Sequence, residues 1–377
     1  MLRKLLLTTV LTTLTFSSLN AAGVNPIASM LNTNEKIFVV ERESESLAII
    51  EKGLTRSHLT GMHNMNHGVV KFDGKDGYVI SRDGWVVKFD PETEKKVKEL
   101  KTSDSAIGFT ITKNFLAVAN YAKKSVDILD RDLNPLQSFE TGSKNVGIKT
   151  YKEYLIFSQM DNDKITVLKD TNCGKGLPKF VIHKEFEDVG VMPFDAMIKD
   201  HNFITGFFQS NFFGVVNLKT MKYSKIDILL EDRKPVLKVP HFGFWSIGGG
   251  YVFIPAVGNN KVLVYTPDFK FVRNIETEGL PVFTALSPDK KYLAVTFSGD
   301  KFPVIQIIDT KTLKIIKRFK FNGKVLHVRW SNVKPNLYVS VNDANMVSVI
   351  DTRTWYVSRE MFQIQKPSGI FIYEEKK

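Results

Sequence analysis

The sequence predicts an all-β protein, an eight-bladed β-propeller closed by its N- and C-terminal strands. Two observations predict this fold. A five-residue strand pattern with alternating apolar residues recurs eight times, and no stretch shows a sustained helical periodicity. The eight copies are Leu47–Glu51, Val86–Asp90, Val126–Asp130, Ile165–Lys169, Val215–Lys219, Val262–Thr266, Ile305–Asp309 and Val347–Asp351.

The spacing of the copies is typical of a propeller. Their last residues are 39, 40, 39, 50, 47, 43 and 42 residues apart, and a four-stranded blade takes about 40–45 residues. A seven-bladed ring with a decorated terminus is the main alternative.

Further strands precede most copies, as a blade requires. A short strand and a turn rich in Gly, Asn, Asp and Ser come directly before the copy. These strands are Tyr78–Ile80, Leu116–Ala119, Tyr154–Phe157, Tyr251–Ile254, Tyr292–Val295 and Leu337–Ser340. Candidate innermost strands lie before them at Gly68–Phe72, Gly108–Thr112, Gly147–Tyr151 and Val325–Trp330.

The two ends of the propeller complement each other. Only Ile37–Val40 precedes the first copy, so the first blade lacks an innermost strand, and Pro367–Ile372 at the C-terminus supplies a matching one. Pairing the two leaves no open sheet edge. We therefore expect a signal peptide over 1–21, an extension over 22–36 and a propeller over 37–377.

The N-terminus predicts export. Arg3 and Lys4 form a positive start, an uncharged apolar stretch follows, and Ala21 offers a small-residue cleavage site. No later stretch has the ~18 apolar residues of a transmembrane helix, so no transmembrane anchor is expected. The sequence predicts a periplasmic protein whose signal peptide is cleaved near Ala21.

Composition excludes several classes of site. The single cysteine, Cys173, rules out an internal disulfide, a Cys-rich zinc site and an iron–sulfur cluster. No motif for covalent c-type haem, a nucleotide phosphate or a catalytic triad is present. The net charge of +12 comes from scattered lysines and arginines, which argues against nucleic acid and favours a carboxylate-rich ligand.

Candidate ligand-binding residues converge on one face. In a blade, the loop entering the innermost strand and the loop between the second and third strands open on the same side. His67, His241 and His327 lie at predicted innermost strands, and the other loops supply Arg42, Arg82, Asn120, Tyr121 and Asp161. Together they predict a central pocket for a large planar anion, with or without a metal. Taken singly, a histidine beside the channel is more often a structural side chain, Asp and Asn in such loops are by default turn formers, and Tyr121 is compatible with packing between blades.

Several blocks of sequence resemble a known family. They are residues 238–247 (KVPHFGFWSI) and 253–264 (FIPAVGNNKVLV), with shorter matches at 41–43, 81–84, 119–121, 188–190, 193–196, 279–283, 325–327 and 367–371. They are similar to the NirF family of heme d1 biosynthesis proteins, which is related to the d1 domain of cytochrome cd1 nitrite reductase.

The resemblance implies a ligand and roles for individual residues. The ligand is heme d1 or its iron-containing precursor, bound in the central cavity. His67 matches the axial iron ligand, with His63 as a rival, and Arg82 matches an arginine that meets the carboxylates. His241 matches a histidine over the distal face, and Asp161 an acidic residue suited to proton transfer.

Departures from the family narrow the function. The chain lacks a c-haem domain and has Asn259 and Asn260 where a reductase has a second distal histidine, so nitrite reduction is not expected. Three roles stay open. They are an enzyme that dehydrogenates or modifies a side chain of the precursor, a carrier that passes it to other heme d1 maturation proteins or to nitrite reductase, and a protein-binding scaffold.

Overall fold

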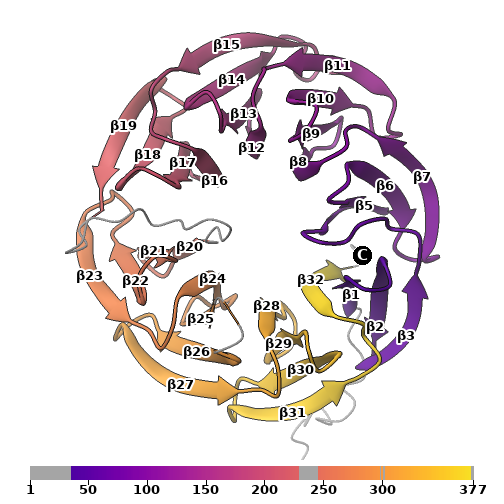
Figure 1. The fold of residues 1–377 in the computed structure, drawn as a ribbon, viewed down its shortest axis with the longest axis vertical. Helices are drawn as coiled ribbons and strands as arrows, with labels where there is room; N and C mark the ends of the chain where they lie inside the picture. The colour runs from indigo at the N-terminus through magenta and orange to yellow at the C-terminus, as the bar shows by residue number, and fades with distance from the viewer. Residues whose placement is uncertain (1–34, 229–244, 298, 300–301, 375–377) are drawn as a thin grey trace, which may run out of the picture. The chain divides into compact units, whose positions relative to one another are not determined.

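The computed structural model describes residues 35–228, 245–297, 299 and 302–374. In these ranges every regular element is a β-strand, and the strands form eight four-stranded antiparallel sheets. The sheets are arranged as the blades of a ring (Figure 1). The predicted eight-bladed propeller is confirmed. The expected signal peptide and nearly all of the N-terminal extension lie outside the described residues.

Each blade runs outward from an innermost strand near the ring axis. Blades 1 to 4 are β32 (Pro367–Glu374), β1 (Glu35–Glu41), β2 (Ser46–Glu51), β3 (Leu54–Leu59); β4 (Val69–Asp73), β5 (Asp76–Ile80), β6 (Trp85–Asp90), β7 (Lys95–Lys101); β8 (Ala106–Ile111), β9 (Leu116–Asn120), β10 (Ser125–Leu129), β11 (Pro135–Glu140); and β12 (Asn145–Tyr151), β13 (Tyr154–Gln159), β14 (Lys164–Asp170), β15 (Phe180–Phe186). Blades 5 to 8 are β16 (Pro193–Lys199), β17 (Asn202–Phe207), β18 (Phe212–Asn217), β19 (Lys222–Asp227); β20 (Ser246–Gly248), β21 (Tyr251–Ala256), β22 (Lys261–Tyr265), β23 (Phe271–Glu276); β24 (Pro281–Leu286), β25 (Tyr292–Phe297), β26 (Val304–Asp309), β27 (Lys314–Lys320); and β28 (Val325–Trp330), β29 (Asn336–Val341), β30 (Met346–Asp351), β31 (Tyr356–Met361).

Blade 1 closes the ring with strands from both ends of the chain. β32 pairs with β1 from Glu35 opposite Glu374 to Glu41 opposite Pro367, and β2 pairs with the other edge of β1. The neighbouring blade adds a hydrogen bond, because the Tyr338 hydroxyl donates to the Glu35 carboxylate at 2.8 Å. The sequence prediction that the C-terminus supplies the missing strand is confirmed.

The recurring strand pattern is the third strand of each blade. Its terminal Asp accepts hydrogen bonds from backbone N–H groups in the following turn, as Asp90 does from Glu92 at 2.8 Å. The Asp309 carboxylate is bonded in the same way, and the hydrogen bond from the backbone N–H of Thr312 is the main cause that lowers its pKa. The recurring Asp therefore ends the strand and shapes the turn toward the outermost strand.

The fifth copy is displaced from its predicted position. The sequence placed it at Val215–Lys219, whereas β18 ends at Asn217. The Asn217 amide oxygen accepts from the N–H groups of Lys219 and Thr220 at 3.0 and 3.1 Å, the bonding that Asp makes in the copies that end in Asp. Asn217 therefore takes the place of Asp here, and the strand ends two residues before the predicted copy does.

The hydrophobic core lies between adjacent blades. The second and third strands supply it, and every residue of β9 and β10 is buried. Between blades 1 and 2, Phe38 packs within 5.4 Å of the Phe89 ring. Outermost strands such as β7 are mostly exposed and rich in lysine, which protects an open sheet edge from pairing. This rigid ring holds the loops on its two faces.

Candidate functional site

Loops from consecutive blades are joined by hydrogen bonds on one face of the ring. The loop that enters β4 bonds to the β1–β2 loop through Met62 N–H and Glu45 O at 2.9 Å. The same loop bonds to the β5–β6 turn through Arg82 N–H and Asn64 O at 2.8 Å. The face therefore places His63 and His67 between the turn of Arg82 and the loop of Arg42.

The chain of loops continues through blades 3 and 4. Ala106 N–H donates to Arg82 O at 3.3 Å, and Tyr121 N–H donates to Ser105 O at 2.8 Å. The Asn145 side chain then donates to Asn120 O at 3.4 Å. Blades 1 to 4 thus present a continuous row of loops.

Arg82 is held in a tight turn beside Tyr121. Gly84 has a φ of 83°, and a Cβ at that position would lie 2.1 Å from Ser103 O, so only glycine fits. The Arg82 guanidinium donates to the Ser105 hydroxyl and lies 5.4 Å from the centroid of the Tyr121 ring. The half-buried guanidinium and the ring form a cation–π pair.

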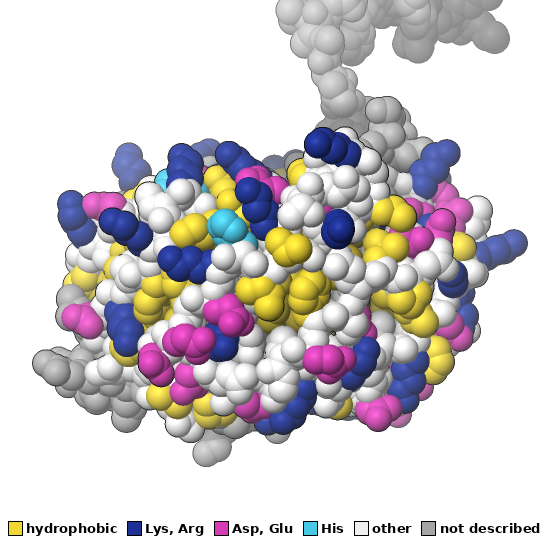
Figure 2. Space-filling model, turned by 90° about the horizontal axis from the view of Figure 1, so that it is seen from above, with side chains coloured by type: hydrophobic (Ala, Val, Ile, Leu, Met, Phe, Trp, Pro, Cys, Tyr) yellow, Lys and Arg dark blue, Asp and Glu magenta, His cyan; other side chains and the backbone are white. Residues whose placement is uncertain are grey.

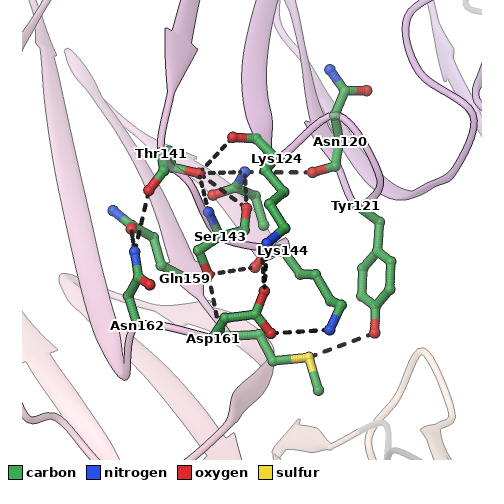
Figure 3. A network of polar contacts seen from close by, with 11 residues as sticks. Asn120, Tyr121, Lys124, Thr141, Ser143, Lys144, Gln159, Asp161 and Asn162 are labelled. Atoms are coloured by element: carbon green, nitrogen blue, oxygen red, sulfur yellow. Dashed lines mark hydrogen bonds and ion pairs between the residues drawn. The ribbon is translucent and has the colours of Figure 1, made fainter.

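Asp161 is bound to a lysine (Figure 3). Its carboxylate accepts from the Lys144 backbone N–H and from the Lys144 ammonium, both at 3.0 Å. Burial alone would raise the pKa of Asp161, but these bonds and the charge of Lys144 lower it overall. Asp161 is therefore a stably ionised carboxylate, which weakens it as a proton acceptor near neutral pH.

The Lys144 ammonium also lies 5.5 Å from the Tyr121 ring centroid. Tyr121 thus has contacts with two cations, Arg82 and Lys144, and its hydroxyl points to the Met160 sulfur at 3.8 Å. Figure 3 shows Tyr121, Lys144 and Asp161 side by side, contributed by loops of blades 3 and 4.

Asn120 is placed differently from its neighbour. It is fully buried, its amide oxygen accepts from Thr102 Oγ1 at 2.9 Å, and its amide nitrogen donates to Ser125 Oγ at 3.1 Å. Both ends of the amide are used inside the protein, so Asn120 organises the loop that carries Tyr121.

The two rival histidines have different surroundings. His63 Nε2 lies 2.9 Å from the Glu99 carboxylate, and its ring stacks on Trp85 with 4.3 Å between centroids. His67 is exposed in the turn that leads into β4, and its φ of 63° is matched by the φ of 62° at His63. A non-glycine residue in this conformation is uncommon and occurs often at functional sites. The contacts of His63 suit a packing role, and the exposure of His67 suits a ligand.

His327 lies within β28, near the ring axis. Its Nδ1 accepts from the N–H of Ile370 on β32 at 3.3 Å, and its ring stacks on Phe371. Burial and then the charge of Arg329 lower the pKa of His327 to about 3. The imidazole is therefore neutral and joins blades 8 and 1. His241, predicted over the distal face, lies outside the described residues.

Two further basic residues lie in loops on this face: Arg42, which the sequence analysis named, and Lys144, which it did not. Arg42, in the β1–β2 loop, has a buried Nε for which the described part of the chain offers no hydrogen-bond partner, and burial lowers its pKa. Lys144 directly precedes β12. Lys144 lies in a loop that enters an innermost strand, a loop class that the sequence analysis identified, but among such residues that analysis named only histidines.

The described residues contain neither a metal-binding cluster nor a membrane-spanning helix. No group of three or more His, Cys, Asp or Glu side chains there is arranged to hold a metal ion. Within the same ranges, none of the elements is a helix with the length and hydropathy needed to cross a membrane.

Comparisons with known proteins cover nearly the whole propeller. The model of the family described as cytochrome D1 heme domain matches residues 31–376. The chain is 29% identical over 358 residues to Protein NirF of Stutzerimonas stutzeri, covering 88% of this chain and 90% of the relative. It is 28% identical over 377 residues to Protein NirF of Pseudomonas aeruginosa, covering 93% and 94%.

A solved structure with the same fold is dihydro-heme d1 dehydrogenase NirN in complex with DHE. It superposes with a TM-score of 0.77 at 22% sequence identity, covering 91% of this chain and 75% of the other. At this identity the similarity describes the fold.

Proposed function

Because the chain belongs to the cytochrome D1 heme domain family, as the resemblance predicted, we propose that it acts in heme d1 biosynthesis by binding a late tetrapyrrole precursor at the centre of its propeller. Relatives that align along nearly their full length carry the name NirF. The structural relative NirN was solved in complex with DHE. These matches support a tetrapyrrole as the ligand.

The observation that carries the proposal is the row of loops on blades 1 to 4. Two cations, Arg82 and Lys144, lie against the Tyr121 ring in this row, and the loop that enters β4 carries an exposed imidazole, His67. An aromatic surface flanked by cations suits a flat ring with carboxylates at its edge. The unpartnered Nε of Arg42 fits this ligand too, because a buried donor needs an acceptor.

In the proposed complex, His67 would hold the iron and Arg82 would pair with a carboxylate. The bound iron tetrapyrrole would supply ligand exchange and redox chemistry at the site. Tyr121 would cover one edge of the ring and Asn120 would fix the loop from inside. His327 would remain a neutral acceptor near the axis, because its nitrogen Nδ1 is already bonded to Ile370.

Conversion of the precursor and its carriage are the two candidate roles. The bonding of Asp161 to Lys144 favours carriage, since it lowers the proton affinity of the carboxylate that was expected to move protons. Conversion, by dehydrogenation or side-chain modification, would then depend on His241 or on a partner. A carrier would release the ligand unchanged to nitrite reductase or to another maturation protein.

We also propose that the mature protein is periplasmic, with its signal peptide cleaved near Ala21. The basic start and the uncharged apolar stretch of the N-terminus support export. N-terminal sequencing of the protein from a periplasmic fraction would test this. A product found only in the cytoplasm with an intact Met1 would contradict it.

The proposed function is tested by a spectral titration of the mature protein with heme d1 and with dihydro-heme d1. Wild type should bind both stoichiometrically, with an axial-ligand spectrum that His67→Ala loses and His63→Ala retains. Identical spectra for wild type and His67→Ala would leave the site but remove His67 as the ligand. Absence of binding by wild type would contradict the proposed function.

The chemical state of the ligand after incubation distinguishes carriage from conversion. After incubation of the complex with an electron acceptor, the ligand is extracted and its absorption spectrum and mass are measured. An unchanged precursor that transfers to apo nitrite reductase supports a carrier, whereas a precursor with altered mass supports an enzyme.

A further inference from the structure

Lys144 differs from an ordinary surface lysine in how firmly its ammonium is placed. The ammonium is 3.0 Å from Asp161 Oδ1 and 5.5 Å from the Tyr121 ring centroid (Figure 3). The Asp161 carboxylate is itself fixed, since its second oxygen accepts from the Lys144 backbone N–H at 3.0 Å. The backbone of Asp161 donates to Ser143 Oγ at 2.8 Å. The lysine is therefore preorganised by its own loop and by the next one.

The ammonium retains donor capacity and access. An ammonium has three N–H donors, and within the described residues Asp161 Oδ1 is the one acceptor recorded for it. The Lys144 side chain keeps 37% of its surface exposed, so a ligand on this face can reach it. A lysine that served only to join the two loops would need neither unused N–H donors nor an exposed side chain.

A neighbouring lysine provides the comparison. Lys124 lies 3.9 Å from Asp161 Oδ2, beyond hydrogen-bond distance, and its side chain is 48% exposed. Its ammonium has no recorded contact with the Tyr121 ring among the described cation–π pairs. Of the two lysines at this carboxylate, only Lys144 is directed along the ring that Arg82 also contacts.

We propose that Lys144 is a ligand-binding residue that recognises a carboxylate of the ring ligand, and that Asp161 positions it. This inference rests on the proposed function, which it deepens by naming the group recognised. Arg82 and Lys144 lie at 5.4 and 5.5 Å from one ring, so two cations can meet two carboxylates on one edge of a planar ligand. In this arrangement Asp161 acts through Lys144 and transfers no proton.

The test uses iron coproporphyrin III, which carries four carboxylates, and its tetramethyl ester, which carries none. Lys144→Met should weaken binding of the acid about tenfold, the effect expected from losing one charge-assisted hydrogen bond, and should leave binding of the ester unchanged. Lys124→Met is the matched control and should bind both probes as wild type does. Lys144→Arg should recover most of the affinity.

A double-mutant cycle tests the positioning role of Asp161. Asp161→Asn should weaken binding of the acid in wild type and have no further effect in Lys144→Met. Its effect should also be independent of pH between 6 and 8, unlike that of a proton-transfer group. Additive losses in the double variant would overturn the positioning role.

The outcomes separate the two proposals. If wild type binds the acid and Lys144→Met binds it equally well, Lys144 is not a ligand residue and the proposed function stands. A loss that is equal for acid and ester would also overturn the inference, because it would indicate altered loop structure. If wild type binds neither iron coproporphyrin III nor dihydro-heme d1, both proposals fall.

Discussion

The imidazole of His327 illustrates how a single side chain couples the propeller to pH. It accepts a hydrogen bond from Ile370 N–H through an unprotonated Nδ1, and burial and Arg329 lower its pKa to about 3. An unfolded histidine has a pKa of about 6.5, so the unfolded chain takes up a proton between these values and the folded chain does not. The contribution of His327 to stability is full above pH 6.5 and falls progressively toward pH 3.

This predicts the behaviour of His327→Gln, which cannot titrate. Its free energy of unfolding, measured by urea denaturation, should fall less steeply than that of wild type between pH 6.5 and 4. The variant is expected to be less stable at pH 7 because the amide packs less well than the ring against Phe371. Equal slopes for the two proteins would show that another group dominates the acid sensitivity.

The sequence predicts where such side chains lie better than what they bond to. It placed Asn120 and Tyr121 in one loop, but adjacent residues of a strand end point in opposite directions, and only the fold shows that Asn120 bonds inward to Thr102 and Ser125. The sequence did not predict a role for Lys144, because its partner, Asp161, is distant in sequence. Which residues of two loops in one blade meet depends on the register of the strands that they flank. A pattern of apolar residues does not determine that register.

At the level of the single strand, one turn chemistry recurs around the ring. Asp309 accepts from Thr312 N–H at 2.7 Å and from Thr312 Oγ1 at 2.8 Å where β26 ends. Asn217 makes equivalent backbone bonds at the end of β18. The bonding requires an oxygen at this position, and a negative charge is secondary.

Asp309→Ala should therefore destabilise the protein by about 1 kcal/mol, the usual net value of such hydrogen bonding. Asp309→Asn should stay close to wild type, because the amide oxygen can accept from the same N–H. Thermal unfolding of the two variants tests this. A loss that is equally large for Asn and Ala would show that charge is what matters here.

For the strands, the sequence was informative because the recurring pattern has a physical cause. Buried third strands need alternating apolar residues, and their ends need a side-chain acceptor for the turn. A few adjacent residues meet both requirements, so the pattern can be recognised in the sequence. The fifth copy is the one whose position the pattern predicted wrongly. Its strand, Phe212–Asn217, meets the same physical requirements, but the acceptor at its end is Asn and not Asp.

For the whole molecule, the ring depends on the pairing of β1 with β32. Removing residues 367–377 should expose one edge of β1 and one side of the hydrophobic cluster that contains Ile37, Val39 and Ile370. We expect a lower unfolding temperature and self-association through the free edge. Thermal unfolding and light scattering measure both effects.

A synthetic peptide of residues 366–377 provides the control, because an added strand can restore the edge pairing. Recovery of the unfolding temperature with the peptide would confirm that the edge is responsible. A truncated protein that is monomeric and as stable as the full chain would contradict the closure argument.

Charge is also organised at this scale. Figure 2 shows Lys and Arg side chains interspersed with Asp and Glu around hydrophobic ones on one side of the propeller, without a single basic stripe. On this side, the distribution agrees with the sequence-based expectation that the basic residues are scattered. The site differs from that background in geometry: its cations lie against an aromatic ring on one face.

The joining of the two chain ends in blade 1 also has a consequence for how the protein is made. β1 is among the earliest parts of the propeller to be synthesised, and β32 is the last. At about 5–20 residues per second, β1 waits on the order of tens of seconds for its inner partner. Until β32 is available, any propeller that has begun to form would leave one edge of β1 unpaired. A chain that ends before β32 therefore cannot complete blade 1, so the closed ring forms only from a chain synthesised through its last strand.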